Sequence, residues 1–202
     1  MRLKWKGIYK GEEQLPKVDL PENAVMYREP KSMAGVNGMA LLMCIPAILP
    51  ALAIIALSAV VKGHLDYDGN IWMMYLALLL CFVAVLPHEL LHAICFGKEA
   101  EVELYFSPKH MAAFVCSTVP MTKGQFIFLS MLPNLVLGWI PLLVWAFVPM
   151  AGSVGTVLLM FSMACILVGG GDYINVWNTL HQVPKGATVQ NSGFHSYWYV
   201  KE

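Results

Sequence analysis

Residues 71–97 read IWMMYLALLLCFVAVLPHELLHAICFG, and this stretch decides the interpretation of the whole chain. It is apolar from Ile71 to Leu86, and the pattern HELLH follows at residues 88–92. A helix rises about 1.5 Å per residue, so the stretch is long enough to cross a hydrocarbon layer of about 30 Å. The sequence therefore predicts a membrane helix that carries two histidines and a glutamate near one end.

Three further apolar runs accompany this one, at residues 39–61, 125–149 and 154–178. The chain has 202 residues, of which 58% are hydrophobic and only 13% charged, a balance far from that of a soluble globular protein. We therefore expect four transmembrane helices in a single membrane-embedded domain, residues 1–202. Nothing resembles a basic nucleic-acid stripe or a phosphate-binding loop, so no nucleic-acid partner is expected. The sequence does not indicate an oligomeric state.

The positive charges predict the orientation of these helices. Seven of the 13 Lys and Arg residues precede the first apolar run, and the two loops on the opposite side hold only Lys62. Because Lys and Arg accumulate on the cytoplasmic side, we expect a multi-pass protein of the cell membrane with both termini in the cytoplasm. Residues 1–33 form a polar amino-terminal segment, and residues 179–202 form a carboxyl-terminal tail.

Short strands are predicted outside the apolar runs. Residues 102–106 and 111–116 read as strands around the turn-forming residues 107–110, which indicates a β-hairpin on the cytoplasmic side. Residues 1–33 contain prolines that favour extended segments over a helix, and residues 193–200 also have strand-like spacing. The expected fold class is all-α integral membrane, a bundle of four transmembrane helices with this small β-hairpin.

The spacing of HELLH suits a metal site. His88 and His92 are four residues apart, so both imidazoles lie on one face of a helix, with Glu89 beside them. A hydrolytic zinc ion takes three protein ligands and keeps a fourth position for water, whose pKa it lowers to about 7. We therefore expect His88 and His92 to bind Zn²⁺ and Glu89 to act as the catalytic base.

A third ligand is expected from another apolar run. Apart from Glu89, Asp172 is the only acidic residue in the four runs. A carboxylate in mid-membrane costs about 2.5–3.5 kcal/mol on insertion scales, so one that is kept there usually has a function. The second and fourth runs are parallel in this topology, and both carry these polar residues in their final third. Asp172 is therefore predicted to complete the metal site; the alternative is a buried polar cluster that ties helices together.

Glycines and asparagines surround these residues. Three glycines at 169–171 precede Asp172, and each would weaken a helix by about 1 kcal/mol relative to alanine. Either the fourth helix approaches the second closely at these glycines, or the helix unwinds locally. Asn134 and Asn175 are candidates to bind a substrate backbone or to orient a ligand. For each of them, an ordinary hydrogen bond between helices is the alternative.

Three segments carry a family resemblance: PHELLHA (87–93), MLPN (131–134) and GGGDYINVWN (169–178). They resemble the bacterial zincin peptidase family, a former domain of unknown function that is distantly similar to the site-2 intramembrane metalloproteases. The resemblance covers about residues 80–190.

The resemblance implies His88, His92 and Asp172 as zinc ligands and Glu89 as the catalytic base. Site-2 proteases carry Asp-Gly at the third ligand, whereas Asp172 is followed here by Tyr173. The site-2 class also presents its substrate as an extended strand beside a sheet, which would give the predicted hairpin a role in substrate binding.

These observations predict a zinc-dependent, membrane-embedded endopeptidase that hydrolyses peptide bonds of membrane-associated or transmembrane proteins. Its partners would be membrane lipid and a peptide or membrane-protein substrate. The main alternative is a catalytically silent zinc-binding scaffold or chaperone, against which the retained Glu89 argues. Haem binding is a third alternative, but residues i and i+4 of one helix approach an iron from the same side, whereas two axial haem ligands come from opposite sides.

Overall fold

The structure is a computed structural model, and it describes residues 1–30, 33–108 and 112–201. The chain divides into two compact units. Unit 1 comprises Met1–Lys31, Val85–Leu132 and Asn175–Glu202, and unit 2 comprises Ser32–Ala84 and Pro133–Ile174. Unit 2 is helical, and unit 1 combines helices with two sheets.

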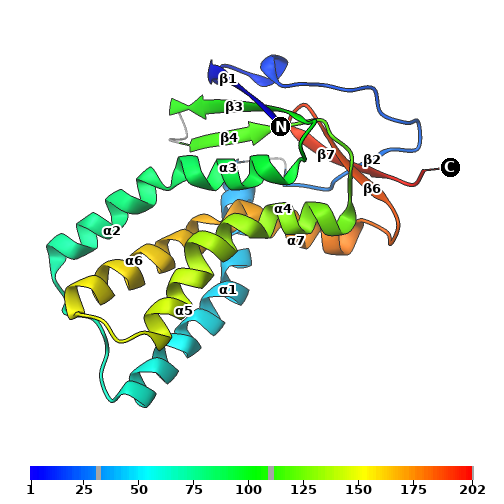
Figure 1. The fold of residues 1–202 in the computed structure, drawn as a ribbon. Helices are drawn as coiled ribbons and strands as arrows, with labels where there is room; N and C mark the ends of the chain where they lie inside the picture. The colour runs from blue at the N-terminus through cyan, green and yellow to red at the C-terminus, as the bar shows by residue number, and fades with distance from the viewer. Residues whose placement is uncertain (31–32, 109–111, 202) are drawn as a thin grey trace. The chain divides into compact units, whose positions relative to one another are not determined.

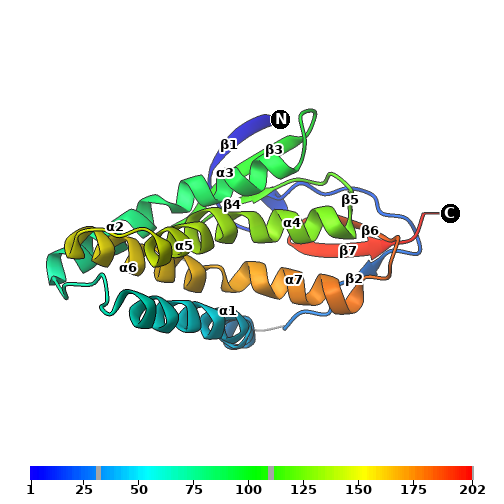
Figure 2. The same ribbon diagram turned by 60° about the horizontal axis from the view of Figure 1, so that its bottom comes forward.

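Unit 2 is built from apolar helices. They are α1 (Met33–Lys62), α2 (Ile71–Val83), a π-helix (Asn134–Trp139), α5 (Ile140–Phe147), α6 (Gly152–Val168) and the first turn of α7 (Gly170–Gln182). α6 packs against α1, α2, α5 and the π-helix, and several of these helices can be followed in Figure 2. Leu142, Trp145 and Ile166 are fully buried. α6 is therefore the element around which unit 2 is organised.

The connection between α1 and α2 is tied to α5 by a buried ion pair. Lys62 Nζ lies 2.6 Å from Asp66 Oδ2 and donates to the Trp145 carbonyl at 2.8 Å. The Trp145 indole donates in turn to the Asp66 carbonyl at 3.1 Å, and His64 Nε2 lies 3.0 Å from Asp66 Oδ1. The hydrogen bond from Lys62, supported by the one from His64, lowers the pKa of the Asp66 carboxyl.

A second aspartate, Asp68, connects the segment between α1 and α2 to the start of α6 by hydrogen bonds. Asp68 Oδ2 accepts from the Ser153 hydroxyl at 2.7 Å, and Oδ1 accepts from the Thr156 hydroxyl at 2.8 Å. The positive end of the helix dipole also favours a carboxylate at this position. A Cβ on Gly155 would lie 2.2 Å from the Asp66 carbonyl oxygen, so only glycine permits this close approach.

Unit 2 is expected to lose stability in acid because of Asp66. A carboxyl group whose pKa is lower in the folded than in the unfolded state stabilises the fold above about pH 4, and this contribution is lost as the pH falls through the folded pKa. The thermal unfolding midpoint in detergent should therefore fall on acidification below about pH 4. Lys62→Met should lower the midpoint at neutral pH and flatten the acid dependence.

Lys4→Met is the matched control, because Lys4 and Glu101 form an ion pair whose side chains are 49% and 56% exposed. Exposed pairs contribute little, so this variant should keep the wild-type pH profile. An unchanged profile in Lys62→Met would show that the buried pair does not stabilise the fold.

The first sheet of unit 1 holds the helix that carries HELLH. β1 (Arg2–Ile8), β3 (Glu101–Ser107) and β4 (Ala112–Cys116) are arranged in the order β1-β3-β4, with β1 parallel and β4 antiparallel to β3. α3 (Val85–Cys95) packs against β4, as Figure 1 shows. Ala93 of α3 and Val102 of β3 are fully buried in one apolar cluster. This cluster fixes α3 on the sheet.

The second sheet of unit 1 packs with α4 (Lys123–Pro133). Its strands are β2 (Val25–Met26), β7 (His195–Tyr199), β6 (Thr188–Ser192) and β5 (Met121–Thr122), all antiparallel and in that order. Phe126 and Leu129 of α4 share an apolar core with Val189 of β6. Lys123 donates to the carbonyls of Leu180 and Val183 at 3.1 and 2.7 Å, which suits a cation at the carboxyl end of α7.

The four predicted apolar runs all form helices. Ala34–Lys62, Ile71–Cys95 and Lys123–Phe147 are each long and apolar enough to cross a membrane. Gly152–Val168 and Gly170–Gln182 would together make a fourth span, bent by 46°. These helices are compatible with a multi-pass membrane protein.

The expected all-α class needs correction, because the described residues contain seven strands in two sheets. The hairpin predicted from residues 102–116 is confirmed by β3 and β4, although residues 109–111, which include Lys109 and His110 of its predicted turn, lie outside the described part of the chain. Of the other strands, β7 lies in the segment 193–200, which has strand-like spacing, and it forms a hairpin with β6. β1, β2 and β5 pair with strands far along the chain, as in the register of Arg2 with Glu101. Local sequence patterns do not report such pairings.

Candidate metal centre

The helical run that carries HELLH is interrupted just before it. α2 ends at Val83 and α3 begins at Val85, so the break at Ala84 lies close to Pro87. A proline lacks the N–H that would bond to the carbonyl four residues earlier, here that of Val83. The missing hydrogen bond accounts for the break, and His88 follows it by one turn.

His92 is held in a defined orientation. Its side chain is buried, and Nδ1 lies 2.9 Å from the carbonyl oxygen of Leu129 on α4. A carbonyl oxygen only accepts hydrogen bonds, so Nδ1 carries the hydrogen and Nε2 keeps its lone pair. Metal-binding histidines are typically held in this way, with the second ring nitrogen donating to a fixed partner.

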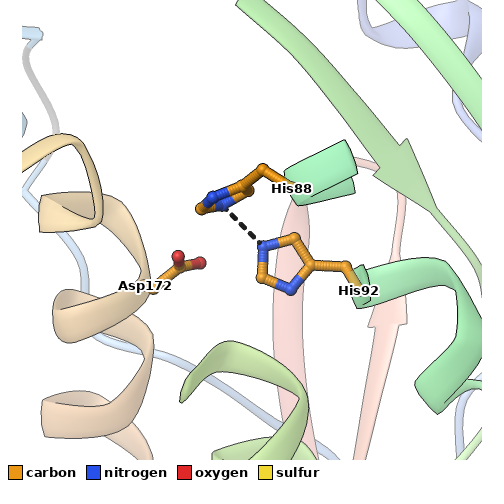
Figure 3. Close-up of side chains that lie close together, drawn as sticks. All are labelled: His88, His92 and Asp172. Atoms are coloured by element: carbon orange, nitrogen blue, oxygen red, sulfur yellow. Dashed lines mark hydrogen bonds between the residues drawn. The ribbon is translucent and has the colours of Figure 1, made fainter. Parts of the chain in front are cut away.

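The two histidines present the same ring nitrogen to each other. His88 Nε2 lies 3.2 Å from His92 Nε2, and the dashed line in Figure 3 marks this contact. Two nitrogens bound to one tetrahedral zinc at about 2.0–2.1 Å are about 3.3 Å apart. The spacing of the nitrogens, which is also that of a hydrogen bond, is therefore compatible with binding to a single ion.

Asp172 lies in the first turn of α7, just after the helix break at Gly169. Its carboxylate is buried, and Oδ2 accepts from Asn134 Nδ2 at 3.0 Å. Ligand atoms of His88, His92 and Asp172 all lie within 4.8 Å of one another, so the group could hold a metal ion (Figure 3). Two nitrogens with one carboxylate oxygen form a donor set that fits zinc.

Glu89 is half-buried on α3 and is bonded to the sheet. Its Oε2 accepts from the backbone N–H of Val115 at 2.9 Å. Val115 lies in β4, which is an edge strand of its sheet among the described strands. The predicted base is therefore held by a backbone donor on the outer edge of β4.

The two asparagines proposed for this region differ in their surroundings. Asn134 is 1% exposed and is hydrogen-bonded to Asp172, a bond between two helices that fits both the ligand-orienting role and the ordinary interhelical alternative. The backbone carbonyl of Asn175 accepts from the Thr179 hydroxyl at 2.6 Å, and a role for its side chain stays a prediction.

The three glycines before Asp172 fit one of the two expected alternatives. The helix is broken at Gly169, as local unwinding requires. A Cβ on Gly169 would meet Asn134, and one on Gly170 would meet Ala40 of α1. The close approaches at these two glycines are therefore to the π-helix and α1, and an approach to the second helix at these positions stays a prediction.

Comparison with known proteins assigns the chain to a family. The family described as "Putative zincin peptidase" matches residues 81–188, more than half of the chain. The chain belongs to this family. The match includes HELLH, Asn134 and Asp172, and zincin peptidases are metallopeptidases that typically use zinc. No curated protein and no solved structure gives a significant match.

Sequence reasoning did not find three contacts of this candidate site. Two are backbone groups, the Leu129 carbonyl and the Val115 N–H, which every residue type offers and which therefore leave no signal. The third is Tyr173, whose hydroxyl donates to Asn134 Oδ1 at 3.1 Å. The only sequence feature that pointed to Tyr173 was its position directly after Asp172.

His92 is expected to be the Nδ1–H tautomer in the metal-free protein, because Leu129 accepts from Nδ1. Histidine ¹⁵N NMR of the detergent-solubilised chain measures this, with the His92 signals identified by their loss in His92→Ala. Zinc should shift the Nε2 signal of His92 and leave that of exposed His181 in place. A protonated Nε2 on neutral His92 would contradict the assignment.

Proposed function

We propose that this chain is a zinc-dependent, membrane-embedded endopeptidase that cleaves membrane-associated or transmembrane proteins. The observation that carries the proposal is the 3.2 Å spacing of the two Nε2 atoms, with Asp172 completing a group whose ligand atoms lie within 4.8 Å of one another. Membership of the zincin peptidase family supports the same chemistry.

The exposure of the apolar helices supports the membrane part of the proposal. In Ile71–Cys95 only 6% of the most apolar stretch is buried within the structure, and in Ala34–Lys62 only 17%. Apolar surface of this extent is unfavourable in water and would be covered by lipid. With Lys and Arg concentrated before α1, both termini would lie in the cytoplasm.

Each residue of the site would have a distinct role in hydrolysis. His88, His92 and Asp172 would hold the zinc, which when bound supplies positive charge at the scissile carbonyl and lowers the pKa of water. Glu89 would take the proton from the attacking water as the new C–O bond forms. It would then deliver this proton to the amide nitrogen as the C–N bond breaks, releasing an amine and a carboxylic acid.

The substrate would bind along the outer edge of β4. Among the described strands, β4 pairs on one side only, with β3, and its Val115 N–H already faces Glu89. An extended peptide adds naturally to such an edge by backbone hydrogen bonds. The resemblance to site-2 proteases, which present substrate beside a sheet, supports this placement.

The proposal predicts which substitutions remove metal and which remove activity. Wild-type protein purified in detergent should carry one zinc per chain by elemental analysis, and His92→Ala and Asp172→Ala should lose it. Glu89→Gln should keep the metal, because Glu89 is not a ligand, yet lower turnover of membrane peptides by about 10²–10⁴-fold, the usual contribution of a general base.

His181→Ala is the matched control, since His181 is an exposed histidine whose Nδ1 bonds to the Trp177 carbonyl. It should keep both zinc and activity. Full activity in Glu89→Gln would refute the role of the base, and zinc retained in His92→Ala would refute the ligand set. Wild-type protein that binds zinc but cleaves no membrane peptide would favour the catalytically silent scaffold.

A further inference from the structure

Asn134 is placed so that both ends of its amide are occupied. Nδ2 donates to Asp172 Oδ2 at 3.0 Å, and Oδ1 accepts from the Tyr173 hydroxyl at 3.1 Å. Asn134 is 1% exposed and Tyr173 is 8% exposed, so water does not compete for these bonds. The amide therefore connects two consecutive side chains of α7.

The Asp172 carboxylate determines which way the amide points. A carboxylate only accepts hydrogen bonds, so a reversed amide would place Asn134 Oδ1 against it and the two acceptors would repel each other. In the observed orientation Asp172 receives a hydrogen-bond donor, and Asn134 Oδ1 faces the Tyr173 hydroxyl, which also lies 3.1 Å from the carbonyl oxygen of Ile166.

Two departures from regular helix meet at Asn134. The residue begins the π-helix Asn134–Trp139, a form that is rare and often found at functional sites. A Cβ on Gly169 would lie 2.1 Å from Asn134 Oδ1 and 2.4 Å from Nδ2, so any other residue at 169 would displace the amide. A Cβ on Gly171 would have no atom within 4 Å, so a side chain at 171 would not displace the Asn134 amide as one at 169 would.

From these contacts we propose that Asn134, Gly169 and Tyr173 form a positioning cluster that fixes the carboxylate of Asp172 for metal binding. Asn134 is then a positioning residue and not a substrate-binding one, since its side chain is buried and both the nitrogen and the oxygen of its amide are hydrogen-bonded to α7. Tyr173 acts through Asn134, and Gly169 provides the space that Asn134 fills. The inference rests on the proposed zinc site.

The test is the zinc affinity of the full-length chain in detergent, measured by competition with a chromophoric chelator. Asn134→Leu keeps the size of the side chain but removes the donor, and it should raise the zinc Kd by about 10–100-fold, as is usual when a partner of a metal ligand is lost. Gly169→Ala should raise it by a comparable factor because it displaces Asn134. Gly171→Ala, the matched control, should change the Kd by less than about twofold.

Tyr173→Phe removes only the hydroxyl and should raise the Kd several-fold. The double variant Asn134→Leu with Tyr173→Phe should bind zinc as Asn134→Leu alone does, because the hydroxyl acts through the amide. The unfolding midpoint of each metal-free variant is measured in parallel. A purely structural role would lower this midpoint without changing the zinc Kd of the folded protein.

The outcomes separate this inference from the proposed function. Wild-type zinc affinity in Asn134→Leu and Gly169→Ala, with zinc lost in His92→Ala, would overturn the positioning cluster and leave the zinc site standing. If the Asn134 and Tyr173 substitutions raise the zinc Kd additively, Tyr173 does not act through Asn134. Zinc retained in His92→Ala would overturn the site itself. If Asn134→Leu does not fold, the zinc Kd values of Tyr173→Phe and Gly171→Ala are compared instead. Equal Kd values in these two variants would overturn the positioning cluster.

Discussion

Polar groups inside apolar helices must find their partners within the protein, and the helices are irregular beside these groups. The break at Ala84 lies one turn before His88, the π-helix begins at Asn134, and the break at Gly169 precedes Asp172. Each irregularity gives up regular backbone hydrogen bonds, which is tolerable only beside protein groups that replace them. The chemistry-bearing side chains therefore lie where the helices depart from regular geometry.

The two sheets of unit 1 support the helix that carries HELLH, one directly and the other through α4. One face of α3 is held by the sheet through Ala93 and Val102, and Glu89 is bonded to Val115 on the sheet edge. α4 holds the same helix through the bond from His92 to the Leu129 carbonyl. α4 in turn shares an apolar core with the second sheet. The strands thus stabilise the orientation of the histidine and glutamate side chains.

The sequence predicted two kinds of feature: those marked by a local residue pattern, and those marked by a charged residue in an apolar run, where a charge is energetically costly. HELLH is a local pattern on a helix, and Asp172 was found because a carboxylate in an apolar run is expensive. The pairing of β1 with β3 could not be found in this way, because Arg2 and Glu101 are neighbours only in the folded chain. The Leu129 carbonyl and the Val115 N–H have no signal at all, since backbone groups are the same in every residue.

The residue after Asp172 differs from the pattern of the site-2 proteases, which the sequence only distantly resembles. Site-2 proteases have glycine at this position, and tyrosine could be taken as evidence against a ligand role for the aspartate. In this chain the Tyr173 ring is buried, and its hydroxyl reaches the amide of Asn134 and the carbonyl of Ile166. The larger side chain therefore supplies a contact that glycine cannot make. Because that contact is to the amide that donates to Asp172, the departure adds to the case for Asp172 as a ligand.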